Sequence, residues 1–225
     1  ESGDAPIKET LAAAILTRSG WSADQVLIDP MCGSGTFLIE AALMATQTAP
    51  GWRRATAHGF GFMRLRSHDP DAFTDYLGQL DEQRIPFRPD SIIGTDIDGE
   101  ILEICRRNLD RAQFSHLVRL KRLALHNFQL PEVLADGNRL LVSNPPYGER
   151  LGSGEDLVRT YQQLGALMKQ HLKGGEAALI VADDAPKALG LRPESKRPMR
   201  NGSIDCHLLR FIIHATRTGP PRSRR

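Results

Sequence analysis

The sequence feature that most constrains the fold is an apolar run that leads through a glycine-rich turn into a helical run. Residues 26–28 (VLI) are apolar, residues 29–36 (DPMCGSGT) form the turn, and residues 37–45 repeat apolar side chains at helical spacing. Gly33 and Gly35 have no Cβ, so the backbone there can turn sharply and come close to a ligand. The free N–H groups of the following helix would face the same turn. This order predicts an α/β fold, in which the turn either binds a ligand or is only a connection.

A second motif, Ser143-Asn144-Pro145-Pro146-Tyr147, follows another apolar run. Two consecutive prolines hold an extended, rigid backbone and remove two N–H donors. Carbonyl groups in this segment are therefore left free to accept hydrogen bonds from another molecule. A polar side chain, two prolines and an aromatic ring are unusual for a simple turn, so the motif predicts a second part of a functional site.

A third apolar run, residues 92–95, ends in Asp96. In dinucleotide-binding folds an acid at this strand end accepts hydrogen bonds from ribose hydroxyls. Asp96 lies 67 residues after Asp29, whereas the gap is about 20 residues in the nicotinamide fingerprint. A plain nicotinamide-binding unit is therefore disfavoured. We expect the glycine-rich turn, Asp96 and Asn144 to converge on one crevice at the carboxyl edge of the sheet.

The segments DPMCGSGT and SNPPYGER resemble motifs of the class I S-adenosylmethionine-dependent amino-group methyltransferases, whose signature is [DNS]PP[YFW]. Both segments are similar to those of the THUMP-associated large-subunit ribosomal RNA guanine-N2 methyltransferases, and the resemblance runs over residues 5–214. It implies a Rossmann-like α/β fold of seven strands, mostly parallel, with a C-terminal antiparallel hairpin. The turn signal Asn201-Gly202 between two extended runs agrees with that hairpin.

The resemblance implies S-adenosyl-L-methionine as the cofactor and guanine N2 of large-subunit ribosomal RNA as the methyl acceptor. The expected catalytic residues are Asn144, Pro145, Pro146 and Tyr147. The Asn144 side-chain oxygen and the Pro145 carbonyl would each accept a hydrogen bond from one N–H of the target amine. Tyr147 would stack on the base. An upstream THUMP domain and a second methyltransferase domain are the expected partners in the same polypeptide.

The expected cofactor-binding residues surround the three strand ends: Thr10, Asp29, Met31, Cys32, Gly33, Gly35, Thr36, Asp96, Ile97, Asn127 and Asn144. Asp29 would repel phosphate; it suits the cofactor's amino group, directly or through water, or it ties the turn together. Many relatives carry an aspartate after the third strand, where this chain has Leu-Ala-Leu-His-Asn. Asn127 is therefore the expected adenine acceptor, with His126 or a backbone carbonyl as alternatives. Thr10 lies in an amphipathic helix, as part of the cofactor wall or as an ordinary cap.

We expect one methyltransferase domain over residues 1–214 and a basic tail over residues 215–225. Residues 49–89 are expected to be an irregular insertion that mixes glycines, aromatic residues and arginines, with a helix start at Asp69-Pro70. The insertion is expected to be a lid packed on the sheet edge. The alternative is an RNA contact, because arginines beside aromatic rings bind and stack on RNA.

Composition and charge limit the partners and the location that we expect for this protein. The net charge of +2 and the pI of about 8.6 permit a nucleic-acid partner without requiring one. No apolar run approaches the roughly 18 residues that span a bilayer, so no membrane association is expected. Three cysteines lie far apart without CxxC spacing, so we expect no metal site, and their sparse, odd number fits a cytoplasmic protein. The chain begins without methionine, and we expect it to be an excised domain.

The motifs leave alternative functions open. The NPPY core also serves adenine-N6 methyltransferases of DNA and glutamine methyltransferases of proteins. The absence of an acid after the third strand leaves room for a catalytically silent module that binds cofactor or scaffolds RNA. A nicotinamide-dependent oxidoreductase is disfavoured by the late position of Asp96 and by the NPPY segment.

Overall fold

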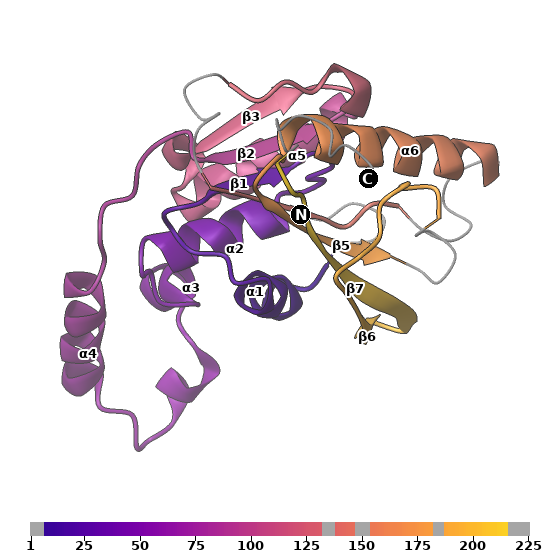
Figure 1. Cartoon of the computed structure of the whole chain (residues 1–225). Helices are drawn as coiled ribbons and strands as arrows, with labels where there is room; N and C mark the ends of the chain where they lie inside the picture. The colour runs from indigo at the N-terminus through magenta and orange to yellow at the C-terminus, as the bar shows by residue number, and fades with distance from the viewer. Residues whose placement is uncertain (1–6, 132–137, 147–153, 182–186, 216–225) are drawn as a thin grey trace, which may run out of the picture.

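One seven-stranded sheet organises the chain (Figure 1), of which a computed structural model describes residues 7–131, 138–146, 154–181 and 187–215. The strand order is β3-β2-β1-β4-β5-β7-β6. Neighbours among β1 to β5 pair in parallel, and β7 runs antiparallel to both β5 and β6. This arrangement confirms the expected fold. The strands are β1 (Val26–Asp29), β2 (Ile92–Asp96), β3 (Val118–Arg122), β4 (Arg139–Ser143), β5 (Glu176–Val181), β6 (Ser195–Asn201) and β7 (Ile204–Ile212).

Helices cover both faces of the sheet and form two cores. On one face lie α1 (Glu9–Arg18), α2 (Thr36–Ala45) and α5 (Gly99–Ala112), and on the other lies α6 (Gly154–His171). Leu27 of β1 packs in the first core, whereas its neighbours Val26 and Ile28 pack in the second. Because both faces are covered, the central strands are continuous apolar runs rather than alternating ones, which is why the sequence marks them clearly. Two short 3-10 helices, η2 (Ser115–Leu117) and η3 (Leu125–Asn127), flank β3.

Residues 49–89 are more regular than the sequence suggested. They contain α3 (Trp52–Ala57), the 3-10 helix η1 (Gly61–Arg64) and α4 (Pro70–Glu82). The predicted helix start is confirmed, because the Asp69 side chain accepts hydrogen bonds from the N–H groups of Asp71 and Ala72.

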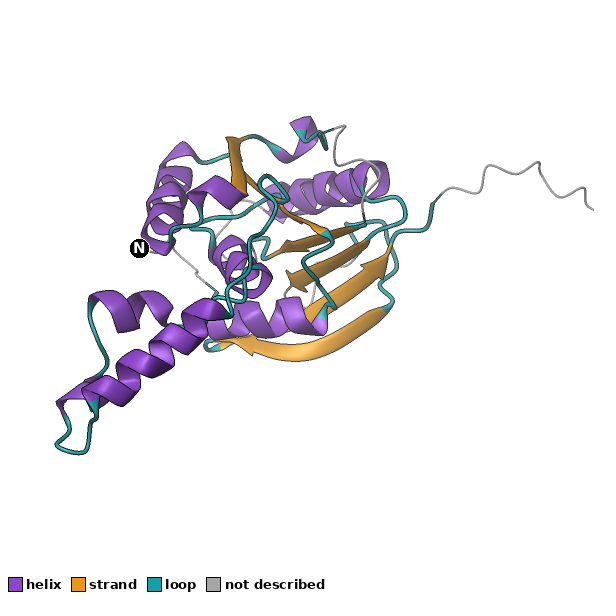
Figure 2. Cartoon of the chain, turned by 90° about the vertical axis from the view of Figure 1, so that its left-hand side faces the viewer, coloured by secondary structure: helices purple, strands orange, loops and turns teal. Residues whose placement is uncertain are grey.

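These three elements form an arm that projects from the body of the domain (Figure 2). No residue of α3, η1 or α4 is buried. The expectation of a lid packed on the sheet edge is therefore wrong. The physical reason is that the apolar face of α4 finds partners within the arm, where Phe73 packs edge-on against Phe62 with ring centres 5.4 Å apart.

Two further findings concern the expected organisation. Of the basic tail expected at residues 215–225, only residue 215 lies within the described residues. Among the helices that the structure describes, none combines the length and apolar character needed to cross a membrane.

Candidate active site

The two motifs that the sequence singled out meet at one edge of the sheet. Strand β1 lies between β2 and β4 and is parallel to both, with Ile28 opposite Leu141 and Asp29 opposite Gly94. The glycine-rich turn after β1, Asp96 at the end of β2 and Asn144 after β4 therefore lie at the same carboxyl edge. In open α/β sheets this edge is where ligands bind.

The side chain of Asp29 connects the turn to the second motif. Its Oδ1 accepts a hydrogen bond of 2.7 Å from the Ser143 hydroxyl and one of 3.3 Å from the Met31 N–H. Asp29 is only 2% exposed, and this burial raises the pKa of its carboxyl group to about 7, although both hydrogen bonds act in the opposite direction. Of the two interpretations of Asp29, the contacts within the protein correspond to the one in which it ties the turn together.

Asp96 holds the turn from the β2 side. Its Oδ2 accepts a hydrogen bond of 3.0 Å from the Gly33 N–H, and its Oδ1 accepts one of 3.1 Å from the Asp98 N–H. Partial burial raises the pKa of Asp96, while these N–H donors lower it. Next to it, the Thr95 carbonyl accepts a hydrogen bond of 2.9 Å from the Cys32 N–H. The position of the acid beside the turn is thus set by the turn's own backbone.

The two glycines of the turn have different structural roles. Gly33 has a φ of +52°, and no atom of another described residue lies within 4 Å of the place where a Cβ would be. Gly35 has a φ of +89°, and a Cβ there would lie 2.5 Å from the Cys105 Sγ of α5. The open space over Gly33 admits the close approach of a ligand, whereas Gly35 lets α5 pack against the turn.

Asn144 presents an acceptor atom at this edge. Its Oδ1 is buried and has no hydrogen-bond partner among the described residues. Buried polar atoms are nearly always paired in proteins, so an unpaired acceptor beside a glycine-rich turn points to a donor on a bound molecule. Pro145 is buried and Pro146 half-buried. Tyr147, the fourth expected catalytic residue, lies outside the described residues.

The remaining expected cofactor residues differ in exposure. Thr10 is exposed in the first turn of α1, Met31 is half-buried against the α6 core, and Thr36 is the first residue of α2. Cys32 is buried, and a hydrogen bond with the Cys105 thiol, together with burial, raises the pKa of its thiol well above the ordinary value.

Two of the expected cofactor-binding residues, Ile97 and Asn127, follow β2 and β3. The Ile97 side chain is 66% exposed. Asn127 is exposed in η3, which lies at the same carboxyl edge because the Leu123 N–H donates a hydrogen bond of 2.8 Å to the Asp96 carbonyl. All of these positions except Thr10 come from strand ends or from the segments that follow them.

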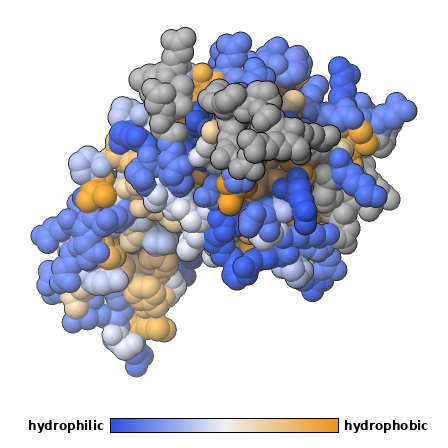
Figure 3. Space-filling model, in the orientation of Figure 1, coloured by the Kyte–Doolittle hydropathy of each residue, from blue (hydrophilic) through white to orange (hydrophobic). Residues whose placement is uncertain are grey.

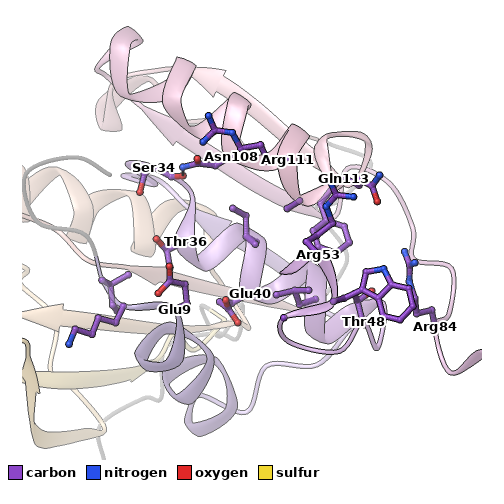
Figure 4. A pocket seen from close by; sticks show the side chains of 18 residues that line it. Glu9, Ser34, Thr36, Glu40, Thr48, Arg53, Arg84, Asn108, Arg111 and Gln113 are labelled. Atoms are coloured by element: carbon purple, nitrogen blue, oxygen red, sulfur yellow. Dashed lines mark hydrogen bonds between the residues drawn. The ribbon is translucent and has the colours of Figure 1, made fainter. Parts of the chain in front are cut away.

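A cavity of about 530 Å³ lies beside this edge and runs along α2 to the base of the arm (Figure 4). It reaches the glycine-rich turn at Ser34 and Thr36, but neither Asp96 nor Asn144 lines it. Glu40 of α2 also lines it, and burial raises the pKa of this carboxyl group to about 7, with the charge of Glu9 acting in the same direction. The cavity is therefore adjacent to the expected cofactor site rather than part of it.

Several residues that support the site were not indicated by sequence reasoning. Ser143 holds Asp29, the Asn108 side chain donates a hydrogen bond of 3.0 Å to the Ser34 carbonyl, and Cys105 packs against Gly35. Ser143 could have been noticed, because it is the first residue of the second motif. Asn108 and Cys105 carry no such signal, since they lie within an amphipathic helix. Within the described ranges, no three His, Cys, Asp or Glu side chains are grouped to hold a metal ion.

Comparison with known proteins agrees with this arrangement. A family model described as RMKL-like, methyltransferase domain (UPF0020) matches residues 1–210. The ribosomal RNA large subunit methyltransferase K/L of Shewanella sp. (strain W3-18-1) is 37% identical over 225 residues, which cover 96% of this chain and 30% of that protein. The protein of the same name from Cellvibrio japonicus is 38% identical over 223 residues, covering 95% of this chain and 29% of that protein. The chain thus spans less than a third of the length of these curated relatives.

A solved structure supports the same assignment of the fold. SMU.472, described as a methyltransferase and crystallised with SAH, has a TM-score of 0.83 and 33% sequence identity to this chain. The match covers 97% of this chain and 55% of that one.

Proposed function

The chain belongs to the RMKL-like methyltransferase domain family (UPF0020), and we propose that it transfers a methyl group from S-adenosyl-L-methionine to an exocyclic amino nitrogen of large-subunit ribosomal RNA. Within that activity we propose guanine N2 as the acceptor. The names of the relatives from Shewanella and Cellvibrio support ribosomal RNA as the substrate. The NPPY motif supports an amino nitrogen as the acceptor, and the similarity of the longer SNPPYGER segment to the guanine-N2 enzymes supports N2.

The residues at the carboxyl edge fit the cofactor. The space over Gly33 is open, Asp96 offers carboxylate oxygens to ribose hydroxyls, and the exposed Ile97 side chain offers an apolar surface to the adenine ring. Asn127 is the acceptor we propose for the adenine amino group. When bound, the cofactor supplies an electrophilic methyl group on a sulfonium. SMU.472, whose crystal structure contains SAH, is a related protein that supports this cofactor.

Asn144 and Pro145 are proposed to hold the target amine. The lone pair of a nucleobase amine is delocalised into the ring, so the nitrogen is a weak nucleophile. Two acceptors, the Asn144 Oδ1 and the Pro145 carbonyl, would orient its N–H bonds and stabilise the positive charge that develops on the nitrogen. Pro146 keeps this segment extended, and Tyr147 would stack on the base, which must leave its helix to enter the site. No general base is required before the transfer, because the proton leaves afterwards.

We assign Asp29 a positioning role. Its Oδ1 already accepts two hydrogen bonds inside the protein, from the Ser143 hydroxyl and the Met31 N–H. It therefore fixes the turn relative to the strand that carries Asn144. Met31, Cys32, Gly35 and Thr36 complete the turn around the cofactor, and Thr10 of α1 is the proposed polar contact from the opposite wall.

A single observation carries the proposal: a buried acceptor on Asn144, without a partner among the residues that the structure describes, lies at the same sheet edge as the glycine-rich turn and Asp96. An amine donor on the substrate would satisfy this acceptor, and a methyl donor bound at the turn would be its neighbour. The proposed partners are ribosomal RNA, an upstream THUMP domain and a second methyltransferase domain, and the proposed location is the cytoplasm.

A methyl-transfer assay tests the proposal. Tritiated S-adenosylmethionine would be incubated with the protein and, in parallel, with ribosomal RNA that lacks the modification, with DNA and with a protein extract. Any neighbouring domains of the natural protein would be retained. We expect label in ribosomal RNA alone, released by nuclease digestion as N2-methylguanosine. Label in DNA or in protein glutamine would overturn the RNA assignment, and label on another RNA atom would overturn guanine N2.

A further inference from the structure

Positive charge gathers in the first half of the arm, over α3 and η1, whereas the second half, α4, is acidic. Residues 41–68 contain no aspartate or glutamate but four arginines: Arg53, Arg54, Arg64 and Arg66. All four are exposed in the structure. The whole chain has a net charge of only +2, so this segment is a local basic surface on a nearly neutral protein. Basic surfaces of this kind attract phosphate groups.

Aromatic rings lie among these arginines. Phe60 and Phe62 stack with ring centres 5.4 Å apart and planes inclined by 13°. The Arg54 guanidinium lies 5.2 Å from the centre of the Phe60 ring, and Phe62 is 45% exposed. Figure 3 shows apolar side chains on the surface of the arm, where exposed Leu65 and Tyr76 also lie. Aromatic rings beside guanidinium groups are the surface that proteins use to bind single-stranded nucleic acids.

The cavity at the base of the arm extends this surface inward. Trp52 and Arg53 of α3 line it together with Arg84 and Arg111, and the Arg84 guanidinium lies 5.7 Å from the Trp52 ring centre. Figure 4 shows Arg53, Arg84 and Gln113 towards one end of the cavity and the carboxyl groups of Glu9 and Glu40 towards the other. Its volume of about 530 Å³ is within the range of small-molecule sites, about 300–1,000 Å³.

We propose that this cavity is a second RNA-binding site, which holds one unstacked nucleotide of the strand that flanks the methylated base. The base would lie against Trp52, its phosphates would contact Arg53, Arg84 and Arg111, and the strand would continue along α3 and η1. This inference rests on the proposed function, because it takes RNA as the substrate. It extends that function by assigning an RNA-binding role to residues that are not part of the methyl-transfer site.

The position of the cavity favours RNA over a protein partner. The cavity reaches the glycine-rich turn at Ser34 and Thr36, so a strand that leaves the methyl-transfer edge could enter it without crossing the sheet. The acids of α4, including exposed Asp71 and Asp75, would repel phosphate. The proposed RNA surface therefore comprises the cavity, α3 and η1, and excludes the outer face of α4.

Fluorescence anisotropy with a labelled single-stranded RNA of mixed sequence tests the site. The variant Arg53→Gln/Arg84→Gln should weaken binding about tenfold or more and lower the salt dependence, since each lost phosphate contact reduces the slope by about 0.7. Arg106→Gln/Arg159→Gln is the matched control, because it removes the same charge and Arg106, like Arg84, has an exposed ion pair with an acid three residues earlier. The control should bind within about twofold of the wild type.

A second pair of variants tests the stacking contact. Trp52→Ala should weaken RNA binding about tenfold, whereas Trp52→Phe should largely preserve it, because it keeps an aromatic face. Asp71→Asn/Asp75→Asn should bind RNA at least as tightly as the wild type. Thermal melting of each variant confirms that it is folded.

The results separate this inference from the proposed function. The cavity variants should keep wild-type affinity for S-adenosylmethionine in calorimetry and the wild-type kcat at saturating RNA, with a raised KM for RNA.

If they bind RNA as tightly as the control, the second site is wrong, while methyl transfer to RNA by the wild type would still stand. If free guanosine monophosphate fills the cavity and the RNA affinity of the variants is unchanged, the cavity is a site for a free nucleotide instead. If the wild type labels no RNA at all, the proposed function fails, whatever the cavity binds.

Discussion

The Ser143 hydroxyl donates a hydrogen bond of 2.7 Å to the Asp29 Oδ1, across 114 residues of sequence. Ser143 is fully buried at the end of β4, and Asp29 is buried at the end of β1. The bond therefore joins the turn that we assign to the cofactor with the segment that we assign to the target amine. In the proposed methyl transfer the rate depends on how closely the donor and the acceptor are held, so we expect this buried link to affect turnover.

Ser143→Ala tests this link. The substitution removes the hydroxyl donor and leaves a buried carboxyl oxygen with only the Met31 N–H, so we expect a loss of stability of about 1–3 kcal/mol. The lost bond stabilises the ionised form of Asp29, so the loss should be larger above pH 7, where that form is populated. Urea denaturation at pH 6 and at pH 8.5 measures both effects. Ser67→Ala, at an exposed position of the arm, is the control; equal losses in the two variants would contradict the role of the bond.

The raised pKa of the Glu40 carboxyl group predicts how the stability of the protein depends on pH. Burial raises the pKa of its carboxyl group from 4.5 to about 7 in the folded protein, so between these values the unfolded chain loses the proton while the folded chain keeps it. The contribution of Glu40 to stability is therefore most favourable below pH 4.5, falls as the pH rises towards 7, and is constant above that.

Glu40→Gln should remove this dependence. We expect the variant to be more stable than the wild type at pH 8 by on the order of 2 kcal/mol, a value reduced from the full linkage because Glu40 borders an open cavity. The two proteins should converge near pH 4.5. The pKa of Asp29 is also raised to about 7, so the variant should keep a weaker decline of the same sign. Urea titrations across this range measure it, with exposed Glu100→Gln as the control; a variant that is less stable than the wild type at pH 8 would overturn the argument.

The fold and the position of the site could be predicted because both depend on local signals. Parallel strands covered on both faces are continuous apolar runs, and the turn after β1 carries its own glycines. Because such strands share a carboxyl edge, Asp96 and Asn144 were expected at the same edge of the sheet, and that part of the expectation is confirmed. The roles of these residues towards the cofactor and the amine remain predictions.

The contacts that secure the site could not be predicted, because they depend on how distant elements pack. Asp29 has the same sequence signature whether or not it accepts a hydrogen bond from the Ser143 hydroxyl, because that bond depends on the register of β1 and β4. The arm shows the same limit. The apolar spacing of α4 indicated a helix with one covered face, but not that Phe62 of η1, rather than the sheet, would cover it.

The same substitution, glycine to alanine, should have different effects at Gly33 and at Gly35. Both have positive φ, so alanine costs about 1–2 kcal/mol of backbone strain at either position. At Gly35 the new Cβ would also lie 2.5 Å from the Cys105 Sγ, and overpacking of this kind adds about 1–3 kcal/mol. Gly33→Ala should therefore be the more stable variant but should bind S-adenosylmethionine more weakly, because its methyl group enters the open space over the turn.

Chemical denaturation, calorimetry and a double-mutant cycle with Cys105→Ala check this pair. Removing the Cys105 sulfur should recover part of the stability lost in Gly35→Ala, with a coupling of at least about 1 kcal/mol, and none of that lost in Gly33→Ala. Equal stability losses for the two glycine variants, or no coupling to Cys105, would contradict the separate roles that the geometry gives them.

Asn144 is the residue on which the proposed chemistry depends most. Asn144→Ala removes the unpaired acceptor and leaves the turn, Asp96 and Ile97 in place. Turnover should fall at least about 100-fold, or about 2.7 kcal/mol, while the affinity for S-adenosylmethionine in calorimetry changes by less than about twofold. Asn144→Asp keeps an acceptor oxygen and should retain more activity than alanine. Asn138→Ala is the control, because Asn138 is an exposed asparagine that directly precedes β4, whereas Asn144 directly follows it. If Asn144→Ala kept turnover within about tenfold of the wild type, a loss of only about 1.4 kcal/mol, the amine would be held by another group and the assignment of this edge to methyl transfer would have to be given up.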